Sequence, residues 1–339
     1  MSGIAKNKSH SSVPLFRLFS KRNPIGVDMG DDILKLAQLE NNDGKGIKLL
    51  AGGSRSRPKD VVTGSIIWQK WAIDSISELT TNGEFSGREV TAALPASEVF
   101  IELIKMPKKK NDKPAGNTEA VLSKIKRKLP FEAEQAMIKY IPTEQENVLV
   151  IAVERTKIDR YLAIYEKAKL QIKSIDVWPA ALTNSYTSFF GRRKTDVETD
   201  AMLVDIESSR TNTVICRHKN LLFARSIPIG RCLLETDEAI TRLVLELTAC
   251  RRQFVSMYKR GQIGRLIFLS GLDADKEICK TIAKKMEIPA QMGDCLAAVQ
   301  ITNSQECGVE RRKSPSTEMT SVQEQGQSGW ATAFGLSLS

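Results

Sequence analysis

Two acidic turns, far apart in the chain, hold the residues that could do chemistry. The stretch GVDMGDDILKL, residues 26–36, places Asp28 near the end of an apolar run and follows it with a turn of Gly and Asp. The stretch LVDIESSRTNTV, residues 203–214, repeats this arrangement around Asp205. Backbone N–H groups at tight turns can bind phosphate oxygens, and a carboxylate beside each turn can hold a hydrated Mg²⁺. The two stretches therefore predict a nucleotide site between two facing hairpins.

The repeated turn suggests a role for each polar residue in it. Asp28 and Asp205 are the expected metal-side carboxylates. The expected phosphate-binding residues are Gly30, Asp31 and Asp32 in the first turn and Ser208, Ser209 and Thr211 in the second. The alternative is a pair of plain acidic β-turns, for which Asp and Gly are favoured in any case. Because such a strand–turn–strand unit begins each half of the chain, the repetition favours a site.

The sequence gives little support for other kinds of active site. The first turn lacks both GxxxxGK[ST] and GxGxxG, and a strand follows it where those loops need a helix. The two histidines, His10 and His218, stand alone, and the six cysteines form no CxxC pair. A metal cluster, a disulfide framework and a nucleophilic hydrolase are therefore not indicated, and the cysteines are expected to be small apolar core residues.

Hydrophobic spacing predicts strands and helices in a mixed α/β order. Two strands flank the first turn within residues 23–40, a third covers 44–56, and a helix covers 65–81. Next come two strands around Pro95, a helix over 118–129 capped by Thr118, a strand over 147–154, a helix over 156–170 opened by Thr156, and a strand over 171–178. After a charged boundary at 192–200, two strands flank the second turn, a third covers 221–230, and helices over 235–259 and 273–286 enclose a strand over 265–271.

The net charge of +10 raises the question of an anionic partner. Basic residues concentrate in 1–22 and in 105–128, but the second segment has no interleaved aromatics, so a solvated face without nucleic-acid contact is expected there. Residues 12–22, SVPLFRLFSKR, either lie on a membrane surface or form a frayed terminus that docks on the fold. No apolar run reaches the ~18–20 residues of a membrane span.

In the order of its segments the chain resembles the PilM family of type IV pilus assembly proteins, which are actin-like relatives of the cell-division protein FtsA. IGVDMGDDILKLAQL resembles the first phosphate motif of that family, and MLVDIESSRTNTVIC resembles the second. ALPASEVFIELIKMP followed by EAVLSKIKRKLPFEAEQAMIKY is similar to an inserted subdomain of that family, in which a strand pair precedes a helix and a further strand. VERTKIDRYLAIYEKAKLQIKSIDVWPAALTN resembles the helix and strand that close the subdomain. RLIFLSG resembles the adenosine-side strand, and GWATAFGLSLS resembles the final helix.

The resemblance implies an α/β fold of the actin-like class, a duplicated ribonuclease H-like fold with two lobes. The first lobe would carry an inserted subdomain, and the second would be reduced. The expected parts are a basic N-terminal tail (1–22), a first lobe (23–200) with the inserted subdomain (about 91–178), a second lobe (201–301), a mobile polar loop (302–328), and a C-terminal helix that packs back on the fold (329–339).

The resemblance also implies ATP and Mg²⁺ in the cleft, with Lys35, Ser270 and Gly271 beside the nucleotide. It implies a cytoplasmic protein, peripheral on the inner membrane, that works with other pilus assembly components. Its main partner would be the cytoplasmic tail of a bitopic PilN-like protein, bound in a groove between the first lobe and the inserted subdomain. In that role the protein is a scaffold with no enzymatic activity, or at most a weak ATPase.

Three departures from the family pattern suggest an alternative to the ATP site, namely a degenerate site that binds no nucleotide. Glu207 replaces a glycine of the second motif, and its charge would repel phosphates. Ser270 and Gly271 lead into Leu272 where a run of glycines is expected, and residues 230–243 are too short for the helical subdomain that roofs the second lobe. The alternative function is an actin-like ATPase or a sugar-kinase-type phosphotransferase; a nucleic-acid binder has only net charge in its favour.

Overall fold

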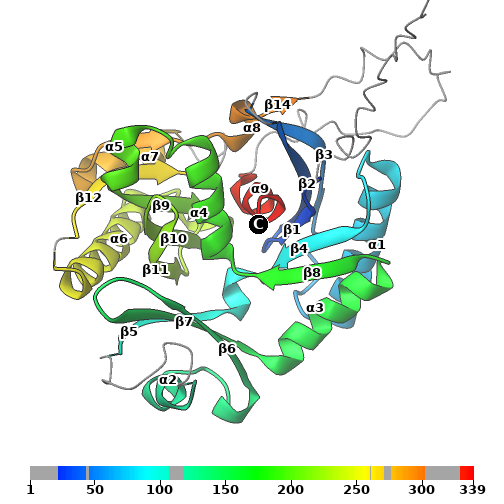
Figure 1. The fold of residues 1–339 in the computed structure, drawn as a ribbon, viewed down its shortest axis with the longest axis horizontal. Coiled ribbons are helices and arrows are strands. Elements are labelled where there is room, and N and C mark those ends of the chain that lie inside the picture. The colour runs from blue at the N-terminus through cyan, green and yellow to red at the C-terminus, as the bar shows by residue number, and fades with distance from the viewer. Residues whose placement is uncertain (1–21, 43–45, 107–117, 260, 271–275, 302–328) are drawn as a thin grey trace, which may run out of the picture.

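The computed structural model describes residues 22–42, 46–106, 118–259, 261–270, 276–301 and 329–339. The expected basic tail, apart from Arg22, and the expected mobile loop at 302–328 lie outside these residues. Two lobes, each built on a mixed sheet, stand side by side, and a third, smaller sheet lies below them in Figure 1.

The first lobe is built on six strands in the order β14-β3-β2-β1-β4-β8. They are β1 (Ile25–Met29), β2 (Ile33–Asn42), β3 (Gly46–Ser56), β4 (Glu89–Ala93), β8 (Gln171–Asp176) and β14 (Gln300–Ile301). β1, β2 and β3 form an antiparallel meander, whereas β4 runs parallel to both β1 and β8. α1 (Ile66–Asn82) and α3 (Arg155–Lys167) cover one face, where Trp68 and Tyr161 pack edge to face.

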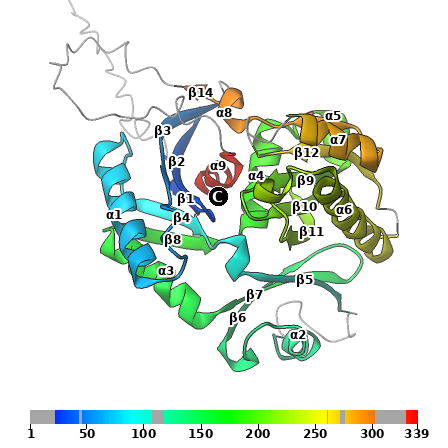
Figure 2. The same ribbon diagram turned by 180° about the vertical axis from the view of Figure 1, so that it is seen from behind.

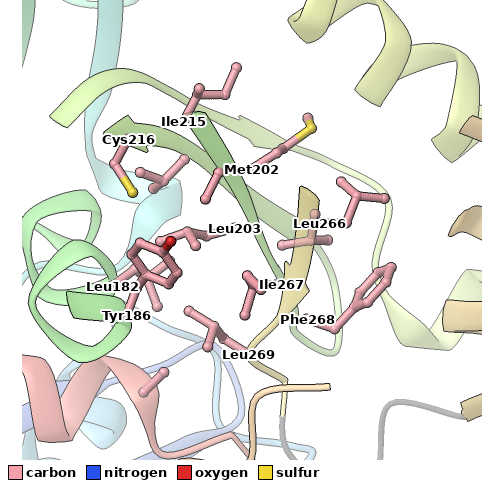
Figure 3. Close-up of a cluster of buried hydrophobic side chains, with 14 of the residues drawn as sticks. Leu182, Tyr186, Met202, Leu203, Ile215, Cys216, Leu266, Ile267, Phe268 and Leu269 are labelled. Atoms are coloured by element: carbon pink, nitrogen blue, oxygen red, sulfur yellow. The ribbon is translucent and has the colours of Figure 1, made fainter. Parts of the chain in front are cut away.

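The second lobe is built on five strands in the order β11-β10-β9-β12-β13. They are β9 (Asp200–Ile206), β10 (Thr211–Arg217), β11 (Asn220–Ile227), β12 (Ile263–Phe268) and β13 (Ala290–Met292). Its helices are α4 (Trp178–Phe189), α5 (Lys194–Glu198), α6 (Asp237–Met257), α7 (Lys276–Met286) and α8 (Cys295–Ala298). α6 and α7 lie on the outer side of the sheet, and α4 lies on the side toward the first lobe (Figures 1 and 2). Figure 3 shows Leu182 and Tyr186 of α4 packed beside Leu203 and Ile267 of this sheet.

The third sheet consists of β5 (Phe100–Lys105), β7 (Asn147–Glu154) and β6 (Ala136–Pro142), in that order. We call it the inserted sheet. α2 (Thr118–Ile125) packs on it through Val121 and Ile125, which form a separate small core with Ile104 and Val150.

Polar contacts join the inserted sheet to the second lobe. The Thr143 and Tyr258 hydroxyls are 2.7 Å apart, and the Asn147 amide donates to the Met257 carbonyl over 2.9 Å. Arg217 of β10 binds Glu144 on the β6–β7 turn, with 2.8 Å between nitrogen and oxygen. The tip of the inserted sheet is thereby fixed to the second lobe at the end of α6.

The helix α9 (Ala331–Ser337) lies between the lobes and is buried along its whole length (Figure 1). It contacts β1, β2 and β4 on one side and α4 on the other. A Cβ atom added at Gly26 of β1 would stand 2.0 Å from the Ala333 carbonyl oxygen, and one added at Gly335 would stand 1.8 Å from the Ala181 carbonyl oxygen. Glycine at both positions lets the helix backbone touch its neighbours on both sides.

Most of the predicted elements are confirmed, with three corrections. Thr156 does not open α3, because the helix begins at Arg155 after Glu154, and the Thr156 hydroxyl donates to the Glu154 carboxylate over 2.8 Å. The α-helix predicted over 118–129 ends at Ile125, and Thr118 is its first residue. The boundary at 192–200 contains α5 and the start of β9.

The bounds proposed for the two lobes stay a prediction. α4 follows the inserted sheet in the chain and packs on both α9 and the second lobe's sheet. β14 and α9, from the end of the chain, both join the first lobe's sheet.

Candidate functional site

The two acidic turns face each other across a narrow cleft between the lobes. The first turn joins β1 to β2, and the Gly30 N–H donates to the Ile33 carbonyl across it over 3.2 Å. The second turn joins β9 to β10, and the Glu207 N–H donates to the Arg210 carbonyl over 2.8 Å. The cleft is lined by Asp28, Gly30, Asp31, Asp32, Ile33, Lys35, Asp205, Ile206, Glu207, Ser208, Arg231, Ser270 and Gly329.

Lys35 is a largely buried cation that lines this cleft. It lies opposite Asp28 in the β1–β2 register, and only 9% of its surface is exposed. Its ammonium donates to the Gly329 carbonyl over 2.5 Å, which ties the first hairpin to the segment that leads into α9. Burial raises the pKa of Asp28 and of Asp205, and the charge of Lys35 offsets part of this rise.

Asp31 connects the two turns directly. Its carboxylate accepts a hydrogen bond from the Ser209 hydroxyl and forms an ion pair with Arg210 at 3.1 Å between Nε and Oδ2. Both partners belong to the second turn, so this contact crosses from one lobe to the other. The neighbouring Asp32 instead pairs with Arg57 at 2.9 Å, within the first lobe.

Three carboxyl groups crowd the cleft and keep their protons more readily than usual. Burial raises the pKa of Asp205 to about 6 and also raises the pKa of Asp28. The pKa of Glu207 is raised well above its ordinary value, mainly by burial and then by the charges of Asp205, Asp28 and Asp31. The Asn212 amide donates to the Glu207 carboxyl over 3.0 Å and holds it in the second turn. The cleft therefore already crowds acidic groups together, and the phosphates of a nucleotide would bring further negative charge beside them.

The first turn fits a nucleotide and the second does not. Gly30 and Lys35 are the residue types that phosphate oxygens need, and Asp28 is a suitable ligand for hydrated Mg²⁺. On the other side Glu207 brings a carboxyl group to the phosphate position, and Ser209 and Arg210 are already bound to Asp31. The cavity volume is about 60 Å³, whereas ligand pockets usually enclose ~300 Å³ or more. As the cleft is built, its residues do not fit a nucleoside triphosphate.

The remaining predicted site residues differ in whether they line the cleft. The Ser270 hydroxyl accepts from the Ile206 N–H over 2.6 Å and closes one end of the cleft. The Thr211 hydroxyl is fully buried and donates to the Ile229 carbonyl over 2.7 Å, so it points away from the cleft. Gly271 lies outside the described residues. Among the residues that the structure describes, no three His, Cys, Asp or Glu side chains gather as a metal site, so Mg²⁺ on Asp28 and Asp205 stays a prediction.

Sequence reasoning missed two residues that shape the cleft. Arg210 stands between predicted site residues, but nothing in its local sequence shows that its partner is Asp31 of the other lobe. Gly329 comes from the last segment of the chain and reaches Lys35 only because α9 docks between the lobes.

A second hollow, which we call the junction groove, lies where the inserted sheet meets α4 and the second lobe. Its cavity volume is about 470 Å³. It is lined by Ile141, Pro142, Thr143 and Glu144 of the inserted sheet, Ala180, Thr183 and Asn184 of α4, and Lys219, Asn220, Leu221 and Leu222 of the β10–β11 hairpin. Aliphatic side chains and two primary amides thus share one concave surface.

Comparison with known proteins places the chain among pilus assembly proteins. A family model described as type IV pilus assembly protein PilM matches residues 26–242, which is more than half of the chain. No curated protein sequence matches it.

Two solved structures show the same fold, and a third matches more weakly. A structure of a PilM–PilN type IV pilus biogenesis complex matches with a TM-score of 0.70 and 20% identity, over 93% of this chain and 98% of that chain. A Bacteroides thetaiotaomicron protein of unknown function with an actin-like ATPase fold matches with a TM-score of 0.50 and 10% identity, over 83% and 93% of the two chains. The cytoplasmic domain of EpsL, an inner-membrane component of the Vibrio cholerae type II secretion system, matches with a TM-score of 0.46 and 10% identity, over 83% and 89%. The predicted actin-like, two-lobed α/β fold is confirmed.

Proposed function

The chain belongs to the type IV pilus assembly protein PilM family, and we propose that it is a scaffold in the assembly of a type IV pilus or a related secretion or competence apparatus. Its partner is the cytoplasmic tail of a PilN-like inner-membrane protein. The observation that carries this proposal is the junction groove, which is the size of a ligand pocket and borders the inserted sheet. Its other walls are α4 and the β10–β11 hairpin of the second lobe, whereas the resemblance implied a groove between the first lobe and the inserted subdomain.

The chemistry of the junction groove suits a short, extended peptide. Pro142 and Ala180 offer apolar surface for side chains, and the exposed Asn220 amide can both donate to and accept from a peptide backbone. The Asn184 amide already donates to the Gly335 carbonyl over 3.2 Å, so it lines the groove as a group bound to the C-terminal segment. Burying apolar side chains supplies affinity, while a few fixed polar groups set the direction of the peptide.

The wall of the groove is rigid enough to hold a partner. Thr143 binds Tyr258, and Tyr258 in turn donates to the Leu222 carbonyl over 2.8 Å. Two walls of the groove are therefore connected through one buried tyrosine. A preformed site loses less conformational entropy when its ligand binds.

We infer that the cleft between the acidic turns does not turn over ATP in this chain. Glu207 and the contact of Asp31 with Arg210 occupy the place of the phosphates. The alternative function, an actin-like ATPase or a sugar-kinase-type phosphotransferase, needs that space. A peripheral position on the cytoplasmic face of the inner membrane follows from the proposed partner. No helix in the described ranges has the length and apolar character to cross a membrane.

Titration of the purified chain with the tail peptide of the PilN-like protein from the same genome tests the proposal. We expect saturable binding, and we expect Ala180→Trp, which fills the groove from α4, to weaken it by roughly tenfold or more. Ala163→Trp is the matched control, since Ala163 is another half-buried helical alanine but lies outside the groove. The proposal fails if the unmodified chain has no affinity for the tail, or if both variants weaken binding equally.

A further inference from the structure

The outer face of α6 exposes apolar side chains that no described element covers. Leu245 is 62% exposed and Val255 is 48% exposed. They lie within one face of the helix, because ten residues correspond to nearly three turns. Ala249 and Arg252 lie between them and are also exposed. The buried residues of α6, such as Leu243, Leu247 and Phe254, face the sheet of the second lobe instead.

Basic side chains surround this apolar stripe. The cations are Arg242, Arg251 and Arg252 on α6 and Lys284 and Lys285 in the last turn of α7. The end of α7 is placed beside the stripe by two hydrogen bonds, from Lys285 to the Thr241 hydroxyl (2.6 Å) and from Arg251 to the Met286 carbonyl (3.2 Å).

The acids near this face do not neutralise it. Glu246 is already paired with Arg225 at 3.6 Å on the flank toward β11. Asp237 and Glu238 lie in the first turn of α6, where Glu238 shares the side of the helix that carries Arg242 and Leu245, so they bound the face at its N-terminal end, and Glu287 follows α7. Arg242, Arg252 and Lys284 enter no ion pair within the part of the chain that the structure describes. The middle of the face is therefore both apolar and cationic.

We propose that this face, α6 with the end of α7, is a contact surface for anionic lipid. Exposed leucine and valine can enter the boundary between head groups and acyl chains, while arginine and lysine beside them meet lipid phosphates. A nucleic acid would use the cations but would leave Leu245 and Val255 in water. The pairing of both residue types on one helix favours a membrane surface.

The C-terminal end of α6, the helix that carries this face, contacts the turn that forms one wall of the junction groove. α6 ends at Met257, whose carbonyl accepts from Asn147 of the inserted sheet, and the Lys259 N–H beyond it donates to Gln145 over 3.0 Å. A bilayer lying on α6 would therefore be near the groove that we assign to a membrane protein's tail. The lipid contact does not depend on that assignment, because its test contains no partner protein.

Co-sedimentation of the full chain with vesicles tests the inference. We expect binding to vesicles of phosphatidylglycerol and phosphatidylcholine and none to phosphatidylcholine alone. Leu245→Asp is expected to weaken binding by roughly tenfold, and Arg242→Ala with Arg252→Ala by roughly 30-fold. Because these side chains are exposed, the variants should fold normally.

Matched controls separate this face from the net charge of the chain. Ile66→Asp replaces an isoleucine that is 84% exposed on the first lobe, and Lys70→Ala with Lys167→Ala removes two exposed cations there. These variants should bind vesicles as the unmodified chain does. The inference is overturned if the unmodified chain does not bind anionic vesicles, or if the controls lose as much vesicle binding as the α6 variants. It is also overturned if Leu245→Asp leaves vesicle binding unchanged while the arginine variants lose binding to duplex DNA and to vesicles alike.

Discussion

Asp31 joins the two lobes at the turn for which the sequence predicts phosphate binding. Its partners, Ser209 and Arg210, come from the opposite turn, so the protein bridges its own cleft. The Asp31–Arg210 ion pair is partly buried, with 15% and 19% of the side chains exposed, and an ion pair of this kind is more effective than a solvated one.

At this scale we expect Asp31→Asn to loosen the cleft. Loss of the charge should lower the free energy of unfolding by about 1 kcal/mol and increase the radius of gyration in small-angle scattering. Asp32→Asn is the control, because its partner Arg57 belongs to the same lobe and the lobes should stay together. Equal scattering curves for the two variants would show that Asp31 does not hold the lobes.

Asp205 makes the stability of the fold depend on pH. Burial raises its pKa from 3.8 to about 6, so over this range the folded chain keeps a proton that the unfolded chain has released. Stability from this group is therefore greatest below about pH 4 and is lost as the pH rises through about 6. Asp205→Asn has no such proton to lose.

We expect Asp205→Asn to raise the free energy of unfolding by about 3 kcal/mol at about pH 8, with the gain disappearing near about pH 4. Urea unfolding across that range measures the difference. Asp74→Asn, at an exposed position of α1, should show no such trend. A gain that is the same at every pH would rule out proton release from Asp205 as its cause.

The sequence predicted which residues gather in the cleft better than it predicted the contacts that they make there. Asp28 and Asp205 end equivalent strands, so the pairing of two strand–turn–strand units sufficed to bring them to one cleft. The substitution of Glu207 was visible as a charge near phosphates. The Asp31–Arg210 bridge was not, because it depends on how far the lobes close, which no local spacing encodes. Thr211 was assigned to the cleft only because it belongs to the turn, whereas β10 directs its hydroxyl to Ile229.

Among the elements, α9 is packed backbone to backbone against two neighbours. Its backbone touches β1 and α4 without side chains between them, because Gly26 and Gly335 lack a Cβ atom. We expect Gly335→Ala to force α9 away from α4 and to lower the free energy of unfolding by about 3 kcal/mol. Thermal or urea denaturation measures this.

The control for that prediction is Gly264→Ala on β12, where the added methyl would meet only the movable side chain of Thr199. Gly264→Ala should lower the free energy of unfolding much less than Gly335→Ala. Comparable losses in the two variants would mean that the contact of α9 with α4 is not as tight as the structure indicates.

Elements with one buried face were predictable and those buried on several sides were not. α6 shows apolar residues at helical spacing, so its position was evident within a few residues. α4 was missed because Thr183 and Ser185, although polar, are buried between α9 and the second lobe, and this obscures the periodicity. The Ser185 hydroxyl donates to the Ala331 carbonyl over 2.5 Å, a partner that lies 146 residues away in the sequence. The strand β6 was expected only through the family resemblance.

For the whole molecule, the inserted sheet is attached to both lobes. It follows β4 of the first lobe in the chain, yet its tip is fixed to the second lobe by Arg217, which binds Glu144 and Asp200 at 2.8 Å each. A change in lobe closure must therefore move the inserted sheet or break these contacts, and either event would reshape the junction groove.

Hydrogen exchange can test this attachment. We expect Arg217→Ala to speed exchange at the backbone amides of the β6–β7 turn by roughly tenfold while β1 and β4 stay protected. Arg55→Ala removes an exposed ion pair with Glu78 in the first lobe and should leave the turn unchanged. If Arg217→Ala also leaves it unchanged, the inserted sheet is held to the second lobe by other contacts.

The position of α9 between the lobes has a consequence for synthesis on the ribosome. β1 spans Ile25–Met29, but the helix that seals its inner face spans Ala331–Ser337, so the first lobe's sheet has an open apolar side until α9 has been made. Contacts this distant in sequence form late and slowly. A prematurely terminated chain would lack its seal, present the exposed strands to chaperones and proteases, and be removed before it could compete for a partner.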